Sequence, residues 1–327
     1  MQRATRGAVG AAVAIAIACT GLGSASATEP QSDATAIAEF IDQVRPNEVT
    51  NESVTLVEGA LTRASADTAA EVPATSAGEL TVTGDSGVPI TVKLPGNGAD
   101  ASIAPDGTVV YGEEAGVTVA VQVGADEARV HTVMADARAA QDVEYVFTDL
   151  TPELNEDGSV SLFATATTEE GSIELSVGSI DAPWAADADG NALATTYRVE
   201  GSSVVQEVAV DENTAFPIVS DPSFQGDCGI VTCTIRFDRA WTKKIRDFGG
   251  DAGAIAGAIA TAATAVAGPV GAAVGAAAGV IVGVRAHIFS TQAGDFYSNG
   301  NCFGVKFPPI VQLGWGTQVT RGTYNCA

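Results

Sequence analysis

One stretch of the chain, residues 252–284, has 33 residues without a charge, and 21 of them are alanine or glycine. Its second half carries a glycine at every fourth position, at Gly271, Gly275, Gly279 and Gly283. On a helix this spacing keeps the glycines near one face, and a face without side chains lets a second helix approach to backbone contact. The spacing predicts a glycine zipper, and Gly253 and Gly257 repeat the same step before Pro269.

Gly268 and Pro269 divide this stretch into two predicted helices, residues 252–268 and 270–290. At about 1.5 Å per residue, the two uncharged parts span roughly 22 to 26 Å, against a bilayer hydrocarbon core of about 30 Å. Alanine and glycine contribute little transfer free energy, so helix packing would have to support insertion. The stretch therefore predicts a helical hairpin that enters a membrane or self-associates. The alternative is a soluble hairpin packed tightly in the protein core.

The first 27 residues have the pattern of a secretory signal peptide. Two arginines precede an apolar run over residues 7–18, and the small residues Ala25 and Ala27 suit cleavage. A lipoprotein modified at Cys19 is the alternative, but Ala16 stands where such sites usually carry a larger aliphatic residue. We expect a secreted protein that is extracellular or associated with the cell envelope.

Removal of the signal peptide leaves four cysteines, Cys228, Cys233, Cys302 and Cys326. An even number in an exported protein predicts two disulfides, and three pairings are possible. The cysteines bracket the uncharged stretch, so disulfides between the two flanks would require both flanks to lie on one side of a membrane, as a hairpin allows. A zinc site is the alternative, but the chain has no clustered histidines and the compartment is oxidising.

Charge divides the exported chain into two parts. Residues 28–222 hold 35 acidic side chains against six basic ones, whereas residues 223–327 hold five against eight. The acidic part argues against nucleic acid as its partner and favours solubility outside the cell. The opposite charges also suggest that the first part shields the second until cleavage within residues 222–227.

Residues 28–78 are predicted to form a helical pro-region and a linker. The first helix places four apolar residues on one face, Ile37, Phe40, Ile41 and Val44. Pro46 ends this helix. A second helical patch is expected around residues 54–61, and the mixture of Ala, Thr, Ser and Glu over residues 62–78 is typical of a linker.

The pattern changes to short strands over residues 79–222. Branched and aromatic residues recur two apart over residues 117–123, 143–147, 159–164, 173–177 and 204–210. Turn signals rich in Asp, Asn and Gly separate the runs, at residues 84–87, 105–107, 155–158 and 189–191. This alternation predicts an acidic, antiparallel β-sandwich-like domain.

The end of this domain carries four groups of residues in order, Pro183-Trp184-Ala185, Asp187-Ala188-Asp189-Gly190, Tyr197-Arg198-Val199-Glu200-Gly201 and Phe216-Pro217-Ile218-Val219-Ser220-Asp221-Pro222. This order resembles the end of a β-rich module in secreted proteins of high-GC Gram-positive bacteria, and the resemblance covers residues 100–222. The module precedes a variety of C-terminal segments. The resemblance therefore implies a delivery, maturation or wall-facing unit rather than a catalyst.

Residues 223–327 are predicted to form a cysteine-containing domain in which a strand over residues 230–237 precedes a basic amphipathic helix. One face of that helix is apolar, with Phe237, Trp241, Ile245 and Phe248. The other face is cationic, with Arg239, Lys243, Lys244 and Arg246. This pattern is typical of an interfacial helix drawn to anionic lipid, with Trp241 and Phe248 as anchors. The alternative is a helix whose aromatic face covers the core.

Catalytic and metal-binding patterns are weak in this sequence. The exported chain has two histidines, His131 and His287, and it has no nucleophile elbow, HExxH pair or phosphate loop. Residues 187–191 alternate oxygen ligands as a calcium loop does, but Ala192 and Arg198 break the EF-hand pattern, so we expect a polar turn. We predict a non-enzymatic protein without a metal, cofactor or small-molecule substrate. An enzyme with an unfamiliar site in the β domain is the alternative.

Together these features favour an α+β multidomain protein. Its N-terminal domain is all-β and sandwich-like, and its small disulfide-linked C-terminal domain contains the Ala/Gly-rich helical hairpin. We predict a membrane-active, bacteriocin-like or toxin-like effector whose hairpin meets an anionic bilayer or a second copy of itself. The alternative is a soluble cell-envelope interaction or structural protein in which the hairpin is a tightly packed core.

Overall fold

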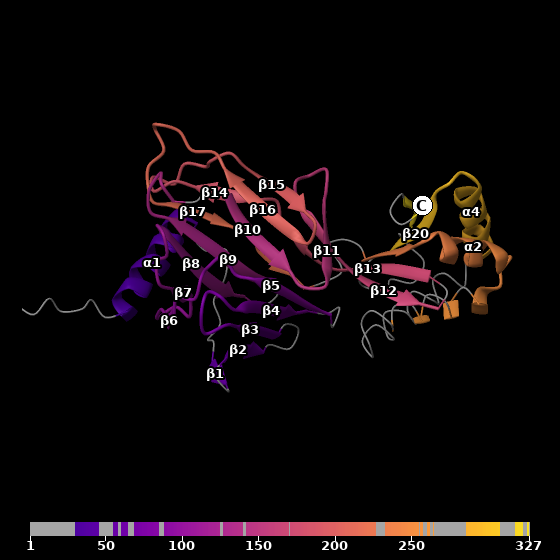
Figure 1. Ribbon diagram of the computed structural model, residues 1–327, viewed down its shortest axis with the longest axis horizontal. Helices are drawn as coiled ribbons and strands as arrows, with labels where there is room; N and C mark the ends of the chain where they lie inside the picture. The colour runs from indigo at the N-terminus through magenta and orange to yellow at the C-terminus, as the bar shows by residue number, and fades with distance from the viewer. Residues whose placement is uncertain are drawn as a thin grey trace, which may run out of the picture.

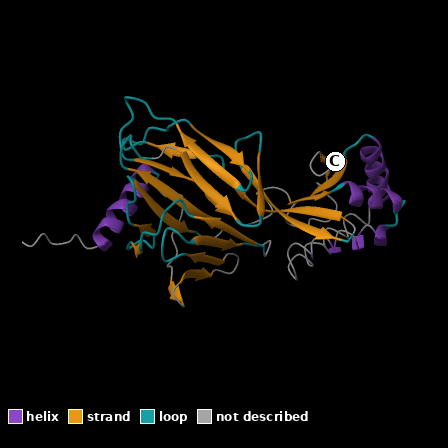
Figure 2. Cartoon of the chain, in the orientation of Figure 1, coloured by secondary structure: helices purple, strands orange, loops and turns teal. Residues whose placement is uncertain are grey.

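The computed structural model describes residues 30–45, 55–57, 60–64, 69–84, 88–124, 127–139, 142–169, 171–226, 233–254, 256–257, 260–261, 264, 286–307, 318–322 and 326. Within these residues two antiparallel β-sheets face each other, and a smaller unit of strands and helices extends from one end (Figure 1). Strands make up most of the regular structure (Figure 2).

The first sheet has eight strands among the described residues. Its order is β1 (Thr55–Val57), β2 (Ala60–Ala64), β3 (Ala69–Val72), β4 (Glu79–Thr83), β5 (Pro89–Lys93), β10 (Asp142–Phe147), β16 (Ser203–Val208) and β15 (Thr195–Glu200). Burial alternates along β4, β5 and β10, because successive side chains of a strand point to opposite faces. The sheet therefore has one face in the core and one face outside.

The second sheet has thirteen strands among the described residues. Its main path is β21 (Gln318–Gly322), β20 (Cys302–Phe307), β19 (Cys233–Phe237), β13 (Gly171–Ile180), β18 (Ser223–Gln225), β9 (Glu127–Met134), β8 (Val117–Val123), β7 (Val109–Tyr111) and β6 (Ala101–Ile103). Four strands branch from this path, β11 (Leu150–Leu154), β12 (Val160–Thr168), β14 (Trp184–Ala186) and β17 (Ile218–Asp221). Almost every residue of β8 and β9 is buried, so both faces of the sheet are covered there.

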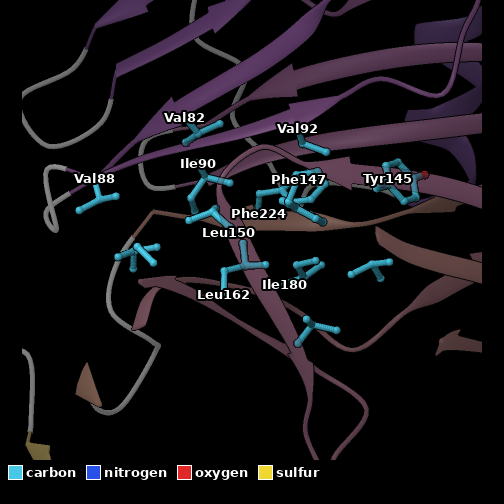
Figure 3. Packing of buried hydrophobic residues seen from close by; sticks show 14 of the residues in the cluster. Val82, Val88, Ile90, Val92, Tyr145, Phe147, Leu150, Leu162, Ile180 and Phe224 are labelled. Carbon is cyan, nitrogen blue, oxygen red and sulfur yellow. The ribbon is translucent and has the colours of Figure 1, made fainter. Parts of the chain in front are cut away.

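The main core lies between the inner faces of the two sheets. Figure 3 shows aliphatic side chains of the first sheet, such as Val82 and Val92, above Leu162 and Ile180 of the second sheet. Phe224 lies edge-on to two rings of the first sheet, with centroids 6.2 Å from Tyr145 and 5.9 Å from Phe147. These buried apolar contacts hold the sandwich together.

Helix α1 (Pro30–Val44) covers part of the outer face of the second sheet (Figure 1). Its buried face consists of Ala34, Ala38 and Ile41. The residues beneath it are also small or branched, namely Ala104, Val110, Ala120, Val133 and Val219. This second cluster explains why β8 and β9 are buried on both faces.

The long hairpin of β12 and β13 joins the sandwich to the C-terminal unit (Figure 1). Near its base β13 pairs with β18, and farther along the same strand it pairs with β19. Helices α2 (Arg239–Asp247) and α4 (Ala286–Ser298) pack against each other and on this extension of the sheet. Three aromatic rings lie against the buried Phe303, from Phe237, Phe289 and Phe296, and Trp241 lies against Phe237 in turn.

The structure confirms the β-rich prediction for residues 79–222, including the strands expected at 117–123 and 143–147. The helical patch expected at residues 54–61 is wrong, because β1 and β2 lie there. The prediction of a linker over residues 62–78 is wrong in part as well, because β3 lies within this range. Strand β3 pairs with the edge of β4, and this pairing outweighs the weak local preference of the segment.

The division of the chain at residue 222 stays a prediction. Residues 223–225 form β18, which pairs with β9 in the sandwich, and the C-terminal strands continue the same sheet through β13. The acidic and basic parts of the chain are thus joined by backbone pairing.

Candidate functional site

The predicted basic helix is present as α2, and Asp238 fixes its start. One carboxylate oxygen of Asp238 accepts the N–H of Trp241 at 2.9 Å, and the other accepts the N–H of Ser172 at 2.6 Å. A Cβ at Gly171, where φ is 147°, would lie 2.6 Å from this carboxylate. Asp238 therefore caps α2 and ties the start of this helix to the first residues of β13.

The aromatic face of α2 is buried in the C-terminal unit. Trp241 is 2% exposed, and its Nε1–H donates to Thr168 Oγ1 at 3.1 Å. Ile245 is fully buried, and Phe248 is half-buried against the same cluster. The prediction that Trp241 and Phe248 anchor the helix at a lipid interface does not fit this placement, since the rings have a protein core to cover. The alternative, a helix whose aromatic face covers the core, describes α2.

Two of the four predicted cations of α2 enclose a tyrosine of α4. The guanidinium carbon of Arg239 lies 4.2 Å from the ring centroid of Tyr297, and that of Arg246 lies 4.6 Å from the same centroid. Arg239 also donates to the carbonyl oxygen of Tyr297 at 3.2 Å. These contacts attach α2 to α4 through cation–π interactions.

The other two cations also contact neighbouring side chains. Lys243 Nζ lies 3.4 Å from the carboxylate of Asp247, and Lys244 Nζ lies 4.7 Å from the ring centroid of Trp241. Asp247 also accepts from Arg246 at 2.7 Å. Lys243, with its side chain 55% exposed, is the most open of the four, because Arg239, Lys244 and Arg246 are half-buried.

The two ends of the uncharged stretch meet at the surface of this unit. A Cβ added to Gly250, just before the stretch, would lie 3.3 Å from the Cα of His287, just after it. Strands β19 and β20, which flank the stretch on either side, are paired antiparallel. The two flanks of the stretch therefore lie on the same side, as a hairpin requires. A single membrane crossing would place them on opposite sides.

Only the beginning of the uncharged stretch lies within the described residues. Asp251 caps it, accepting the N–H of Gly253 at 2.9 Å, and helical residues follow. Gly253, Gly257, Thr261 and Thr264 are all exposed. The zipper positions Gly271, Gly275, Gly279 and Gly283 lie outside the described residues.

Among the described residues, no helix combines the length and the apolar character needed to cross a bilayer.

One disulfide is present among the described residues, and it joins Cys302 to Cys326 with a Cα–Cα distance of 5.6 Å. Both cysteines follow the uncharged stretch, so this bond does not link its two flanks. Cys233 lies in β19, whereas Cys228 lies outside the described residues. The second predicted disulfide stays a prediction, and the bond between Cys302 and Cys326 leaves these two cysteines for it.

His131 is a buried histidine on the outer face of the second sheet. Its Nε2 lies 2.9 Å from Gln122 Oε1, Gln122 donates to Thr108 at 3.2 Å, and Thr108 donates to the carboxylate of Asp106 at 2.7 Å. The carboxylate of Asp106 is the final acceptor of this series of hydrogen bonds, so each residue of the series donates to the next. The proton of the neutral His131 ring therefore lies on Nε2. Burial, together with the charges of Arg45 and Arg129, lowers the pKa of His131 to about 3. His131 is therefore neutral at physiological pH.

The turn after β14 is a polar turn, as predicted. Asp187 is buried, and its carboxylate accepts the backbone N–H groups of Asp189 at 3.0 Å and Asn191 at 2.8 Å. An open depression of about 390 Å³ lies beside this turn, between it and residues 209–214. Across the described ranges, no three His, Cys, Asp or Glu side chains are grouped as metal ligands.

The sequence analysis missed two contacts that join distant elements. Arg45, directly after α1, forms an ion pair with Asp221 of β17 and lies 4.6 Å from the ring centroid of Trp184 in β14. Tyr297 is the second, through its contacts with α2. A lone arginine or tyrosine carries no spacing signal, so only the fold reveals these partners.

Comparison with models of protein families gives no match, and comparison with curated proteins gives none. Among solved structures, a mutant glycoside hydrolase family 81 enzyme from Clostridium thermocellum is similar at 12% sequence identity and a TM-score of 0.20. The similarity covers 58% of this chain and 30% of the hydrolase chain. A TM-score this low carries no argument about fold or activity.

Proposed function

We propose that this protein is a secreted, non-enzymatic effector that acts on lipid bilayers. Its acidic β-rich body carries the uncharged segment, residues 252–284, to a membrane. The segment is the part that meets the lipid, and the signal peptide and disulfides predicted from the sequence suit export.

The contact between Gly250 and His287 carries this proposal. Because Gly250 and His287 lie close together at the two ends of the segment, a segment that entered a membrane would leave and re-enter the body at one point. The exposed Gly253 and Gly257 favour an outside partner over a packed core, since a helix packed through its glycines would cover them.

The zipper glycines give the segment a way to pack on itself or on a second copy. Each half is slightly short for the hydrocarbon core, so close packing along Gly271, Gly275, Gly279 and Gly283 would have to stabilise the inserted form. The partner of the segment is therefore lipid together with a second helix.

Liposome flotation with dye release tests the proposal on the oxidised, exported chain. We expect the protein to float with anionic vesicles and to release dye. Gly275→Leu combined with Gly279→Leu should abolish release, because leucines on the zipper face prevent close approach. Ala273→Leu combined with Ala277→Leu is the matched control, since it adds the same two side chains away from that face and should preserve release.

A second function is favoured by the contacts of α2. Trp241 is buried, and Arg239 and Arg246 are engaged with Tyr297, so the helix offers less to anionic lipid than its sequence pattern predicts. This suits a soluble cell-envelope interaction or structural protein. In the same experiment that protein would stay at the bottom of the gradient with the dye retained, and this outcome would contradict the membrane proposal.

A further inference from the structure

Arg45 makes two contacts with the β body that together define a site. Its guanidinium forms an ion pair with the carboxylate of Asp221, which is 2% exposed. The same guanidinium lies over the indole of Trp184, 4.6 Å from the ring centroid. A planar, delocalised cation suits both partners, because it can donate to a carboxylate in its plane and present its face to an aromatic ring.

The sheet builds this site from two neighbouring strands. Trp184 and Asp221 are directly opposite each other in the antiparallel pairing of β14 with β17. Strand β17 is in turn paired with β9, so the backbone beneath the site is held on both sides. The two residues lie about 40 positions apart in the sequence but are held as one unit.

The surface beside the site is shaped for a helix. Five small or branched side chains, from the second sheet and from Ala104 directly after β6, face α1, and α1 meets them with Ala34, Ala38 and Ile41. Alanines on both sides let the helix lie close to the sheet but bury little apolar area. Helix α1 belongs to neither sheet, so side-chain contacts of this kind hold it in place.

We propose that Trp184 and Asp221 form an arginine-recognition site at the end of a helix-binding surface, and that residues 30–45 are its intramolecular ligand. The surface takes an amphipathic helix with small residues on its buried face and an arginine directly after its last turn. It follows that a cut between α1 and β1 leaves residues 30–45 bound as a peptide that exchanges with the same peptide in solution.

A nicked form of the full exported chain tests this proposal. A specific protease site is placed within residues 46–54, the chain is cut, and a fluorescent peptide of residues 28–45 is added. Fluorescence anisotropy then follows exchange of the labelled peptide with the resident one. We expect saturable binding. Arg45→Met in the peptide should weaken binding at least tenfold, and Arg45→Lys should lie between, because an ammonium cannot match both partners.

The matched control is Glu39→Gln in the peptide, since Glu39 is an exposed residue of α1 and should not affect binding. All four peptides meet the same unaltered body, so loss of folding cannot explain a difference. A second arm uses Asp221→Asn in the body, with its fold checked by near-ultraviolet circular dichroism. This body should lose most of its preference for the wild-type peptide over the Arg45→Met peptide.

Equal affinity of the wild-type and Arg45→Met peptides would overturn the proposal and leave α1 held by its apolar face alone. Failure of the labelled wild-type peptide to bind the nicked body would overturn it too. The outcome is independent of whether the uncharged segment meets lipid.

Discussion

At the scale of single residues, arginines join parts of this molecule that are distant in sequence. Arg236 of β19 lies 3.9 Å from the ring centroid of Phe163 and pairs with Glu153 of β11 at 2.7 Å. Arg45 fixes α1 to the sheet in the same way. Each guanidinium combines a carboxylate with an aromatic face, so its loss would remove two contacts at once.

His131 should make the stability of the protein depend on pH. Its pKa is lowered to about 3 in the folded state from 6.5, so below pH 6.5 the unfolded chain binds a proton that the folded chain does not. This contribution is present above pH 6.5 and is lost as pH falls toward 3, with a limiting slope of about 1.4 kcal/mol per pH unit.

The difference between wild type and His131→Gln isolates this effect. Urea unfolding from pH 7 to 5 should show the free energy of unfolding falling more steeply for wild type than for the variant, in which an amide can still donate to Gln122. Parallel curves for the two proteins would show that His131 takes up no proton on unfolding in this range.

At the scale of elements, α2 is defined by its cap and by the core beneath it. Asp238 serves both α2 and β13, and Thr242 links the helix to β20 by accepting the N–H of Phe303 at 3.0 Å. The helix is therefore fixed at its start and along its buried face.

Replacing the cap should weaken the C-terminal unit. Asp238→Ala removes the acceptor of two backbone N–H groups, and we expect it to lower the free energy of unfolding by about 2 kcal/mol. Asp247→Ala, at the exposed end of the same helix, is the matched control and should cost less than about 0.5 kcal/mol. Chemical denaturation followed by Trp fluorescence measures both, and equal effects would argue against the cap.

The sequence predicts best the helices and strands whose apolar side chains recur regularly because they face the core. Valines recur two apart over residues 117–123 because Val119, Val121 and Val123 all face the main core, and α1 ends at Val44, two residues before Pro46. The amphipathic pattern of α2 shows that one face is apolar but not what covers it. Phe289 and Phe303 cover it, and both lie more than forty residues farther along the chain. Asp221 lies 176 residues from Arg45, so local sequence could not have paired them.

At the scale of the whole molecule, one sheet runs through both the acidic and the basic parts of the chain. Strand β13 has its base in the sandwich core and its far end in the C-terminal unit. Arg236 meets Glu153 across the same boundary. Shielding of one part by the other stays a prediction, but these contacts place opposite charges against each other.

The shared strand predicts cooperative unfolding. We expect a single thermal transition for the oxidised chain, because separating the C-terminal unit would expose both the edge of β13 and the core around Phe303. Calorimetry compared with near-ultraviolet circular dichroism tests this. Two resolved transitions would show instead that the two parts unfold independently.

The Cys302–Cys326 disulfide should contribute to the stability of that single unit. It closes a loop with a sequence separation of 24 residues. Cys302→Ser combined with Cys326→Ser should therefore lower the free energy of unfolding by about 3 kcal/mol. Urea titration of the non-reduced proteins gives the value, and an unchanged midpoint would argue against the bond.

Hydrogen exchange of the oxidised, exported chain, with and without anionic vesicles, tests the membrane proposal most directly. The account predicts that vesicles slow exchange in peptides covering residues 252–284 and leave the β body unchanged, because the account has only this segment meet lipid. Exchange in that segment that is the same with and without vesicles would contradict the account and leave a soluble envelope protein in its place.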